Sequence, residues 1–322
     1  MREVRLGKTN LSVSAIAFGT WAFGGEWGAV DVDAATATIH RALELGVTFF
    51  DTAQAYGFGQ AERILGDALR SSARREDVKI ATKGGLRKDG DRLVRDTSPA
   101  WLREGVEDSL RSLHTDYIDV YQLHWPDLGT PAAETGAALA ALLAEGKIRH
   151  VGVSNYSPDQ IDELARFVDV ETLQPPYHLF RREIEAEILP YCAAHDMGVL
   201  VYGPMAHGLL SGTMSTDTTF SPDDWRSHSS DFTGQTFAAN LAVVAQLKTF
   251  AADRGISLPT LAVAWALANP AVDVAIVGAT KPAYLDDSTA AADVKLEADD
   301  LSEIERIMAP AVPVKGPSPE GM

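Results

Sequence analysis

The chain is poor in cysteine, because Cys192 is the only one among its 322 residues. A single cysteine excludes an intrachain disulfide and a metal site built from several cysteines. Positive charge is also in short supply: 28 lysines and arginines face 45 aspartates and glutamates, which leaves a formal net charge of −17. That balance argues against a nucleic-acid backbone or an anionic membrane as a partner. It is typical of a soluble, acidic protein, which we expect to be cytoplasmic.

Long apolar runs and several catalytic motifs are missing as well. The N-terminus, MREVRLGKTNLSVS, has no hydrophobic segment of signal-peptide length. The most apolar stretch starts at Leu261 and is interrupted by Asn269, Pro270 and Asp273, so the sequence predicts no membrane span. HExxH and GxSxG do not occur, which leaves zinc hydrolysis and serine acyl transfer without candidates.

What the sequence does contain is clearest in one stretch, VTFFDTAQAYGFGQAERILGDAL, at residues 47–69. It opens as a buried strand, ends on the carboxylate of Asp51 and turns through a loop that carries Tyr56. A helix follows, with apolar residues at helical spacing. An ionisable residue at the end of a hydrophobic strand is a common component of α/β active sites. A capping aspartate and a packing tyrosine would be the ordinary explanation if the arrangement occurred once.

The same strand-then-helix unit recurs along the chain. Two alternating runs within residues 3–17 predict a leading hairpin. Eight short β runs, each succeeded by a helical pattern, lie at residues 16–18, 47–51, 78–82, 118–123, 150–154, 172–177, 198–202 and 274–280. Such alternation implies a parallel sheet, and eight units fit a closed barrel. We therefore predict an α/β fold, a (β/α)8 TIM barrel with an N-terminal β-hairpin, in one domain of residues 1–322. An open doubly wound sheet is the alternative, but no GxGxxG follows the first strand to support it.

Local signals mark helix starts and two segments outside the repeat. Asp33, Ser98 and Ser157 are predicted N-caps, and each serine is followed by proline at the first helical position. A long polar segment, residues 213–235, follows the seventh strand, and a proline-rich tail occupies residues 310–322.

Six polar residues and one glycine stand at the ends of seven predicted strands. They are Asp51, Lys83, His124, Asn155, Gln174, Tyr202 and Gly278. Each one alone has an ordinary structural explanation, such as a surface lysine or a core histidine. The carboxyl ends of all strands in a parallel barrel emerge on one face, however, so their shared position predicts a single polar site at the barrel mouth.

The residue types at this mouth point to proton transfer at an oxygen. A free tyrosine, with a pKa near 10, is a poor acid at neutral pH unless its phenolate is stabilised. An adjacent ammonium group stabilises the phenolate, and a carboxylate behind the lysine keeps the lysine charged and oriented. Tyrosine, lysine and aspartate in this arrangement could protonate a carbonyl oxygen as hydride reaches the carbon.

Over essentially its whole length the sequence resembles the aldo-keto reductase superfamily. The resemblance rests on the motifs FFDTAQAYGFGQAE, IATKGG, YQLHWPD, VGVSNYS and VYGPMAHGLLSG in combination. It implies a catalytic tetrad of Asp51, Tyr56, Lys83 and His124, with Tyr56 as the general acid. It also implies a nicotinamide coenzyme bound across the barrel mouth without a Rossmann motif.

Further site residues are implied by the same resemblance. Ser154, Asn155 and Gln174 should hold the carboxamide of the coenzyme, and Tyr202 should stack on the nicotinamide ring. The small-residue loop of Gly203, Pro204, Met205, Gly208, Ser211 and Gly212 should wrap the pyrophosphate with its N–H groups. Arg226, in the segment 213–235, should close over the coenzyme. Gly278, Thr280, Lys281 and Asp287 should form the adenosine-phosphate site, at a helix start suited to an anion.

The chain departs from the family pattern in the coenzyme region. Asp287 and Ser288 stand where glutamate and asparagine are frequent, Tyr284 where arginine or glutamine is common, and Gly203 where serine is frequent. Phosphate recognition would then rest on Lys281 together with Arg226. The expected coenzyme is NADP(H), with NAD(H) as the alternative.

The expected substrate is a small-molecule carbonyl compound, either an aromatic or medium-sized aldehyde or a ketone. Trp21, Phe23, Trp27, Phe58 and Trp125 lie on loops expected at the mouth and could line its pocket or merely cover the barrel. Two other functions stay open: oxidation of a sugar or cyclitol alcohol, and a nicotinamide-sensing subunit resembling the β subunits of potassium channels. The oligomeric state is open as well.

Overall fold

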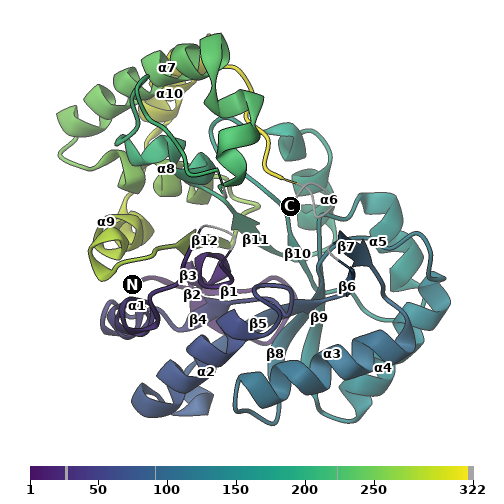
Figure 1. Ribbon diagram of the computed structural model, residues 1–322. Coiled ribbons are helices and arrows are strands. Elements are labelled where there is room, and N and C mark those ends of the chain that lie inside the picture. The colour runs from purple at the N-terminus through teal and green to yellow at the C-terminus, as the bar shows by residue number, and fades with distance from the viewer. Residues whose placement is uncertain (26–27, 91, 223, 318–322) are drawn as a thin grey trace.

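Eight parallel strands close into a barrel in the computed structural model, which describes residues 1–25, 28–90, 92–222 and 224–317 (Figure 1). The strands are β3 (Ile16–Gly19), β4 (Phe49–Asp51), β5 (Lys79–Gly84), β8 (Ile118–Leu123), β9 (Ile148–Ser154), β10 (Thr172–Gln174), β11 (Gly198–Tyr202) and β12 (Val274–Gly278). Each pairs with the next in chain order, and β12 pairs with β3 to complete the ring. The predicted (β/α)8 barrel is confirmed.

A hairpin of β1 (Glu3–Arg5) and β2 (Ser12–Ser14) precedes the barrel, as predicted. Its apolar residues Leu6, Leu11 and Val13 pack with the side chains that fill the barrel interior. Gly7 allows this close approach, because a Cβ at its φ of +48° would collide with the backbone at Gly198. The hairpin therefore covers one end of the barrel, and the site has to lie at the other.

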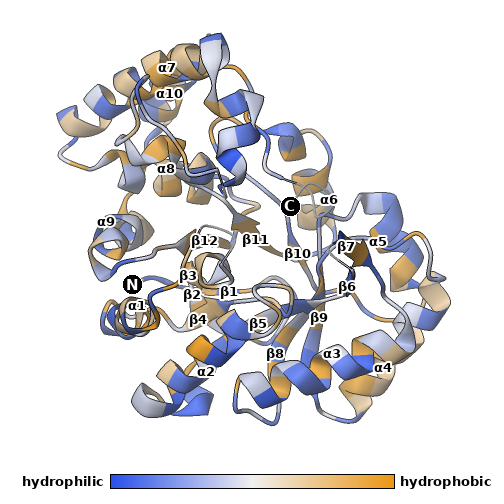
Figure 2. Cartoon of the chain, viewed as in Figure 1, coloured by the Kyte–Doolittle hydropathy of each residue, from blue (hydrophilic) through white to orange (hydrophobic). Residues whose placement is uncertain are grey.

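Helices surround the barrel and carry both hydrophobic and hydrophilic residues (Figure 2). They are α1 (Val32–Glu44), α2 (Gln60–Ser72), α3 (Pro99–Ser112), α4 (Ala132–Ala144), α5 (Pro158–Ala165), α6 (Ile188–Ala194), α7 (Gly234–Asp253), α8 (Leu258–Leu267), α9 (Leu285–Ala290) and α10 (Ala298–Met308). Ser98 and Ser157 cap α3 and α5 as predicted. Asp31, not Asp33, caps α1, because the helix begins at Val32 and Asp33 already lies in its first turn.

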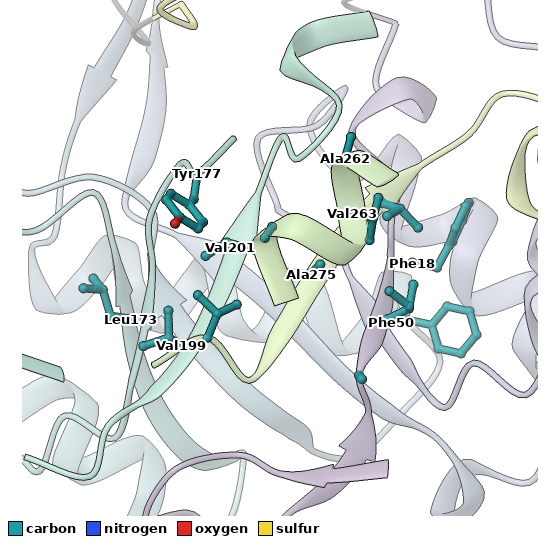
Figure 3. Packing of buried hydrophobic residues seen from close by; sticks show 14 of the residues in the cluster. Phe18, Phe50, Leu173, Tyr177, Val199, Val201, Ala262, Val263 and Ala275 are labelled. Carbon is teal, nitrogen blue, oxygen red and sulfur yellow. The ribbon is translucent and has the colours of Figure 1, made fainter. Parts of the chain in front are cut away.

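The strands alternate between two apolar layers. Phe49 and Val120 point into the barrel, whereas Phe50 and Tyr121 point outward into the layer under the helices. Figure 3 shows this outer layer, where Phe18, Phe50 and Val201 lie close to residues of α8. Because successive side chains of a strand alternate, the same rule turns Asp51, Lys83 and Gln122 toward the barrel axis.

Some elements differ from the predicted pattern. A second hairpin, β6 (Leu86–Asp89) with β7 (Arg92–Arg95), follows β5 and was not predicted. The segment 213–235 contains 3-10 turns at Trp225–His228 and Ser230–Phe232, and its last two residues already belong to α7. None of the helices in the described part of the chain is long and apolar enough to cross a membrane.

Hydrogen bonds fasten the C-terminal tail over three parts of the chain. The N–H of Val312 donates to Asn240 Oδ1 at 2.9 Å, and Asn240 Nδ2 donates to Val312 O at 3.0 Å. The backbone N–H of Val314 donates to Phe180 O at 3.0 Å. The N–H of Lys315 donates to Asp231 Oδ2 at 2.8 Å. The tail thus joins the loop after β10, the segment 213–235 and α7.

Candidate active site

A buried ion pair lies at the centre of the polar mouth. Lys83 Nζ, on β5, is 2.6 Å from Asp51 Oδ1 at the end of the neighbouring strand β4, and it also donates to Thr52 O at 2.9 Å. Lys83 is 1% exposed and Asp51 3%. Burial lowers the pKa of Lys83, while the Asp51 carboxylate acts in the opposite direction. Asp51 is therefore the group that opposes loss of the ammonium charge.

Two glutamine amides bind the other oxygen of the same carboxylate. Gln174 Nε2 donates to Asp51 Oδ2 at 2.8 Å, and Gln122 Nε2 donates to it at 3.5 Å. The amide of Gln174 also reaches Gln122 Oε1 at 3.3 Å. Gln174 was predicted at a strand end, and it is there, with its N–H directed at Asp51. The sequence prediction missed Gln122, although it faces inward two residues before His124.

Tyr56 is brought to the lysine by a sharply turned loop. Lys83 Nζ lies 3.5 Å from the Tyr56 hydroxyl, within reach of a weak hydrogen bond. The three residues that follow, Gly57, Phe58 and Gly59, all have positive φ, at 57°, 47° and 89°. This left-handed run leads the chain directly into α2 and leaves Tyr56 at the mouth.

His124 completes the predicted tetrad. Its ring lies 5.7 Å from that of Tyr56 in an edge-to-face arrangement. Burial, reinforced by the Lys83 charge, holds the pKa of His124 well below its ordinary value, so the imidazole is neutral at physiological pH. No described residue binds its Nδ1. A neutral imidazole can hydrogen-bond to a carbonyl oxygen without adding charge.

Ser154, Asn155 and Tyr202 form one hydrogen-bonded group beside the tetrad. Asn155 Nδ2 donates to His124 O and to Ser154 Oγ, both at 3.1 Å. The Tyr202 hydroxyl donates to Asn155 Oδ1 at 2.9 Å, and burial raises the pKa of Tyr202 to about 12. Asn155 itself has a φ of 63°, in the left-handed region that asparagine tolerates well. The structure therefore brings these predicted coenzyme residues together.

The loop after β11 has the backbone expected of an anion cradle. Gly203, Ala206, His207, Gly208 and Gly212 all have positive φ, at 68°, 48°, 56°, 92° and 70°. A Cβ at Gly208 would approach Arg226 Nη1 to 3.2 Å, so this residue leaves space that a side chain would fill. Pro204, Met205 and Ser211 lie in the same loop. Successive backbone N–H groups in such a conformation suit a pyrophosphate.

Arg226 is fixed against this loop. Its Nε donates to Asp224 Oδ1 at 3.0 Å, its Nη2 to Asp224 Oδ2 at 2.6 Å, and its Nη1 to His207 O at 3.0 Å. Asp224 therefore holds the guanidinium beside the Gly203–Gly212 loop. The coenzyme-closing role of Arg226 and of the segment 213–235 stays a prediction.

The predicted adenosine-phosphate residues follow β12. Gly278, Thr280, Lys281 and Asp287 are all exposed. Asp287 lies in the first turn of α9 beside Asp286, which is paired with Arg41 at 2.7 Å. A positive and a negative side chain are therefore both available here to a ligand. The tyrosine, the amide donors, the glycine loop and Lys281 together fit the chemistry of a nicotinamide dinucleotide.

The predicted aromatic wall is only partly present. The Trp21 ring stacks at 6.4 Å from that of Tyr56, which places it at the mouth. Trp125 packs against the guanidinium of Arg95, and Lys88 lies over Phe58. Phe23 is a core residue, 2% exposed and packed on Phe18, so of the two roles left open for it the structure favours covering the barrel. Trp27 lies outside the described residues.

Two histidines that the sequence prediction missed lie near Trp21. The ring of His207 contacts those of Trp21, Trp225 and His178 at 6.5 Å, 5.0 Å and 5.9 Å. Burial, with Arg181 and Arg226 nearby, lowers the pKa of His207 to about 3. The only sequence signal was a histidine within a glycine-flanked loop, which does not indicate its partners.

Comparisons with known proteins agree with this geometry. The aldo/keto reductase family model matches residues 15–309. Aldo-keto reductase YhdN of Bacillus subtilis (strain 168) is 41% identical over 310 residues, covering 96% of this chain and 94% of the relative. The NADH-specific methylglyoxal reductase of Escherichia coli (strain K12) is 35% identical over 328 residues, with 97% and 99% covered.

A solved structure extends the agreement to three dimensions. The glycerol dehydrogenase AKR11B4 from Gluconobacter oxydans superimposes with a TM-score of 0.89 at 40% sequence identity, covering 98% of this chain and 97% of that one. The family resemblance seen in the motifs is thereby confirmed. The chain belongs to the aldo/keto reductase family, and it is an oxidoreductase that acts on carbonyl or alcohol groups.

Proposed function

We propose that the protein reduces an aldehyde or ketone to an alcohol with NADPH, and that Tyr56 donates the proton. The observation that carries the proposal is the buried Asp51–Lys83 pair, with Lys83 Nζ 3.5 Å from the Tyr56 hydroxyl. A reduced nicotinamide coenzyme supplies the hydride when it is bound. Aspartate, lysine and tyrosine in this order are what a general acid of high intrinsic pKa requires.

Each member of the tetrad has a distinct task in this scheme. Lys83 stabilises the negative charge that develops on Tyr56 as the proton leaves, and Asp51 keeps Lys83 charged and directed at the tyrosine. His124, which is neutral, orients the carbonyl oxygen by a hydrogen bond. Trp21, stacked on Tyr56, borders the space that the substrate would occupy.

We assign the parts of the coenzyme to the residues that the family resemblance implies for each. Asn155 and Ser154 are proposed to face the carboxamide, Tyr202 the nicotinamide ring, and the Gly203–Gly212 loop the pyrophosphate. The segment 213–235 is proposed to cover the coenzyme, because Arg226 is already bonded to that loop. Gln174 supports the site through Asp51, and its proposed contact with the carboxamide would use its oxygen.

We infer a modest preference for NADPH over NADH. Arg226 is engaged at the loop by Asp224, so recognition of the 2′-phosphate rests on Lys281. The carboxylate of Asp287, in the first turn of α9, would repel the negatively charged 2′-phosphate, and one relative is named as NADH-specific. A single exposed lysine contributes little net charge pairing, which predicts a preference of about tenfold or less.

The test follows consumption of the reduced coenzyme by its absorbance, with an activated aromatic aldehyde and either NADPH or NADH. Tyr56→Phe should abolish reduction while coenzyme binding, measured by fluorescence titration, is retained. Undiminished turnover in this variant would overturn the assignment of Tyr56. Consumption with NADH alone would keep the mechanism and discard the preference for NADPH.

Oxidation of an alcohol is the second candidate, favoured by the 40% identity to a glycerol dehydrogenase. The same tetrad would then act in reverse, with Tyr56 taking the proton. Turnover of polyols with the oxidised coenzyme at alkaline pH, without measurable aldehyde reduction at neutral pH, would support this direction. The complete tetrad supports an enzyme over a coenzyme-sensing subunit.

A further inference from the structure

Two buried histidines lie beside the mouth, and the proposed reaction does not use them. We call His178 and His207 the imidazole pair. His178 comes from the loop after β10, and His207 comes from the Gly203–Gly212 loop after β11. Their rings meet edge to face at 5.9 Å. Loops that follow the strands of a parallel barrel form its functional face, so the pair belongs to the same face as the tetrad.

Trp21 connects the imidazole pair to the reacting tyrosine. Its ring stacks on that of Tyr56 at 6.4 Å and contacts that of His207 at 6.5 Å. Trp225 packs edge to face on His207 at 5.0 Å. His207 is 8% exposed, whereas His178, the other member of the pair, is 1% exposed. His207 is therefore the member that borders the space beside Trp21, and His178 lies behind it.

The side chain of His178 is polar but has no polar partner among the described residues. Neither its Nδ1 nor its Nε2 is hydrogen-bonded there. Burial, with His207 and Arg181 nearby, holds the pKa of His178 well below its ordinary value, so both imidazoles are neutral at physiological pH. Buried polar groups are nearly always hydrogen-bonded, and phenylalanine would fill this place without an unpaired nitrogen. Packing alone therefore does not account for a histidine here.

The ring of His207 is held in place and has space at one edge. Its backbone has a φ of 56°, and its carbonyl oxygen accepts from Arg226 Nη1 at 3.0 Å. A Cβ added to Gly316, in the C-terminal tail, would lie 2.8 Å from His207 Nε2 and 2.9 Å from its Cε1. Any side chain at position 316 would therefore fill the space next to this nitrogen, and glycine leaves it open.

The chemistry of a neutral imidazole selects the group that fits against it. Such a ring has one N–H donor and one nitrogen acceptor, and a hydroxyl group can both accept and donate. An apolar group in the same place would leave the ring nitrogens unpaired, which disfavours its binding.

We propose that His207 is a specificity-determining residue: its ring, backed by His178, forms a hydrogen bond to a hydroxyl group of the substrate. The preferred substrates are therefore aldehydes or ketones that carry a hydroxyl group at the end remote from the carbonyl. This inference rests on the proposed function, because Tyr56 has to bind the carbonyl end while His207 binds the other.

The test compares two aldehydes of the same shape. In para-hydroxymethylbenzaldehyde a hydroxyl group stands where para-ethylbenzaldehyde has a methyl group. The wild type should show a kcat/KM about tenfold higher for the hydroxylated aldehyde. His207→Phe keeps an aromatic ring and removes the hydrogen bond, so it should abolish this preference and change kcat/KM for para-ethylbenzaldehyde by less than about twofold. The meta-substituted pair is measured in the same way, so that a different position of the hydroxyl group is also tested.

His195→Phe is the matched control. It makes the same substitution at an exposed histidine at the C-terminal end of α6, and it should leave the preference unchanged. His207→Gln supplies an amide with a donor and an acceptor, and it should retain part of the preference that His207→Phe loses. A fall in kcat/KM by the same factor for both aldehydes in His207→Phe would overturn the proposal, because His207 would then serve the fold or the coenzyme.

A nuclear magnetic resonance titration of protein with ¹⁵N-labelled histidine reads the contact without turnover. The His207 ring nitrogens are assigned by their absence from the spectrum of His207→Phe. In the presence of the oxidised coenzyme, which cannot reduce an aldehyde, para-hydroxymethylbenzaldehyde should shift these signals far more than para-ethylbenzaldehyde does. Equal shifts with both aldehydes would contradict a hydrogen bond to His207.

The outcomes keep this inference apart from the proposed function. A wild type that reduces both aldehydes equally well, or a His207→Phe variant that keeps the wild-type preference, overturns the role of His207 and leaves the reductase standing. A stronger preference for para-carboxybenzaldehyde that persists in His207→Phe also overturns it, because the charge of Arg181 would then select the substrate. A wild type that reduces none of these aldehydes refutes the proposed function, and the ring-nitrogen signals still decide on His207.

Discussion

Replacing Lys83 by methionine is the change that separates the fold from the chemistry most clearly. Methionine has nearly the length of the lysine side chain and fills the same volume, but it carries no charge. The Asp51 carboxylate then stays buried, 3% exposed, and its partners among the described residues are the Gln174 and Gln122 amides. Breaking a buried pair by removing one member typically costs about 3–5 kcal/mol. The two amides place the expected loss of stability near the lower value, about 3 kcal/mol.

The effect on catalysis follows from a separate distance. A unit charge 3.5 Å from the Tyr56 oxygen stabilises a phenolate by roughly 4–5 kcal/mol at an effective dielectric constant of about 20. The Asp51 carboxylate, 2.6 Å from the ammonium, cancels more than half of this gain and leaves about 2 kcal/mol. We therefore expect Lys83→Met to lower kcat by about thirtyfold.

A double variant tests the division between these two effects. Asp51→Asn together with Lys83→Met removes the unpaired charge, so it should recover about 2 kcal/mol of the unfolding free energy. It should recover none of the activity. Urea unfolding gives the first quantity, and steady-state reduction of a saturating aldehyde gives the second. If Lys83→Met kept kcat within tenfold of the wild type, the lysine would not act on Tyr56 as we argue.

Two further predictions concern the scaffold. Gly84→Ala should lower the melting temperature, because its Cβ would overlap the Tyr121 hydroxyl. Adding Tyr121→Phe to the same chain should restore part of the loss. If Gly84→Ala had the melting temperature of the wild type, the Tyr121 hydroxyl would be free to move and the argument would be wrong. Burial raises the pKa of Asp273 to about 6, above its unfolded value of about 3.9, so the native state binds this proton more tightly and its stability falls as the pH rises between those values. Asp273→Asn removes this pH dependence. The difference in unfolding free energy, variant minus wild type, should therefore rise by about 2 kcal/mol from about pH 4 to pH 7. If urea titration gave the same difference at every pH in that range, the assignment to Asp273 would be contradicted.

The sequence predicted the barrel because strand and helix periods are local properties. Eight apolar runs with intervening helical patterns sufficed, and the polar residues at the ends of six of them indicated the mouth. The position of Lys83 shows the limit of this approach: it was expected after its strand and lies within β5. Its inward direction follows from alternation with Ala81, so its place at the mouth could be predicted even though the strand boundary could not.

Side-chain partners were harder to predict than positions. Gln122 was read as part of an apolar strand, although alternation from His124 would have turned it toward Asp51. The β6–β7 hairpin was missed despite Asp89-Gly90, a recognised turn signal. His178 and His207 lie 29 positions apart, and their contact depends on the packing of two loops. No local pattern encodes that contact.

The hydrogen bonds of residues 312–315 in the C-terminal tail bear on the order in which the protein assembles during synthesis. Domains fold largely as the chain emerges from the ribosome, and residues 312–315 emerge after all eight strands of the barrel. Until then the Asn240 amide, buried in the finished protein, has no Val312 backbone to bind, and the Phe180 carbonyl lacks the N–H of Val314. These hydrogen bonds therefore form only after the strands of the barrel have been made. A nascent chain would have all eight strands before it has the bonds of residues 312–315.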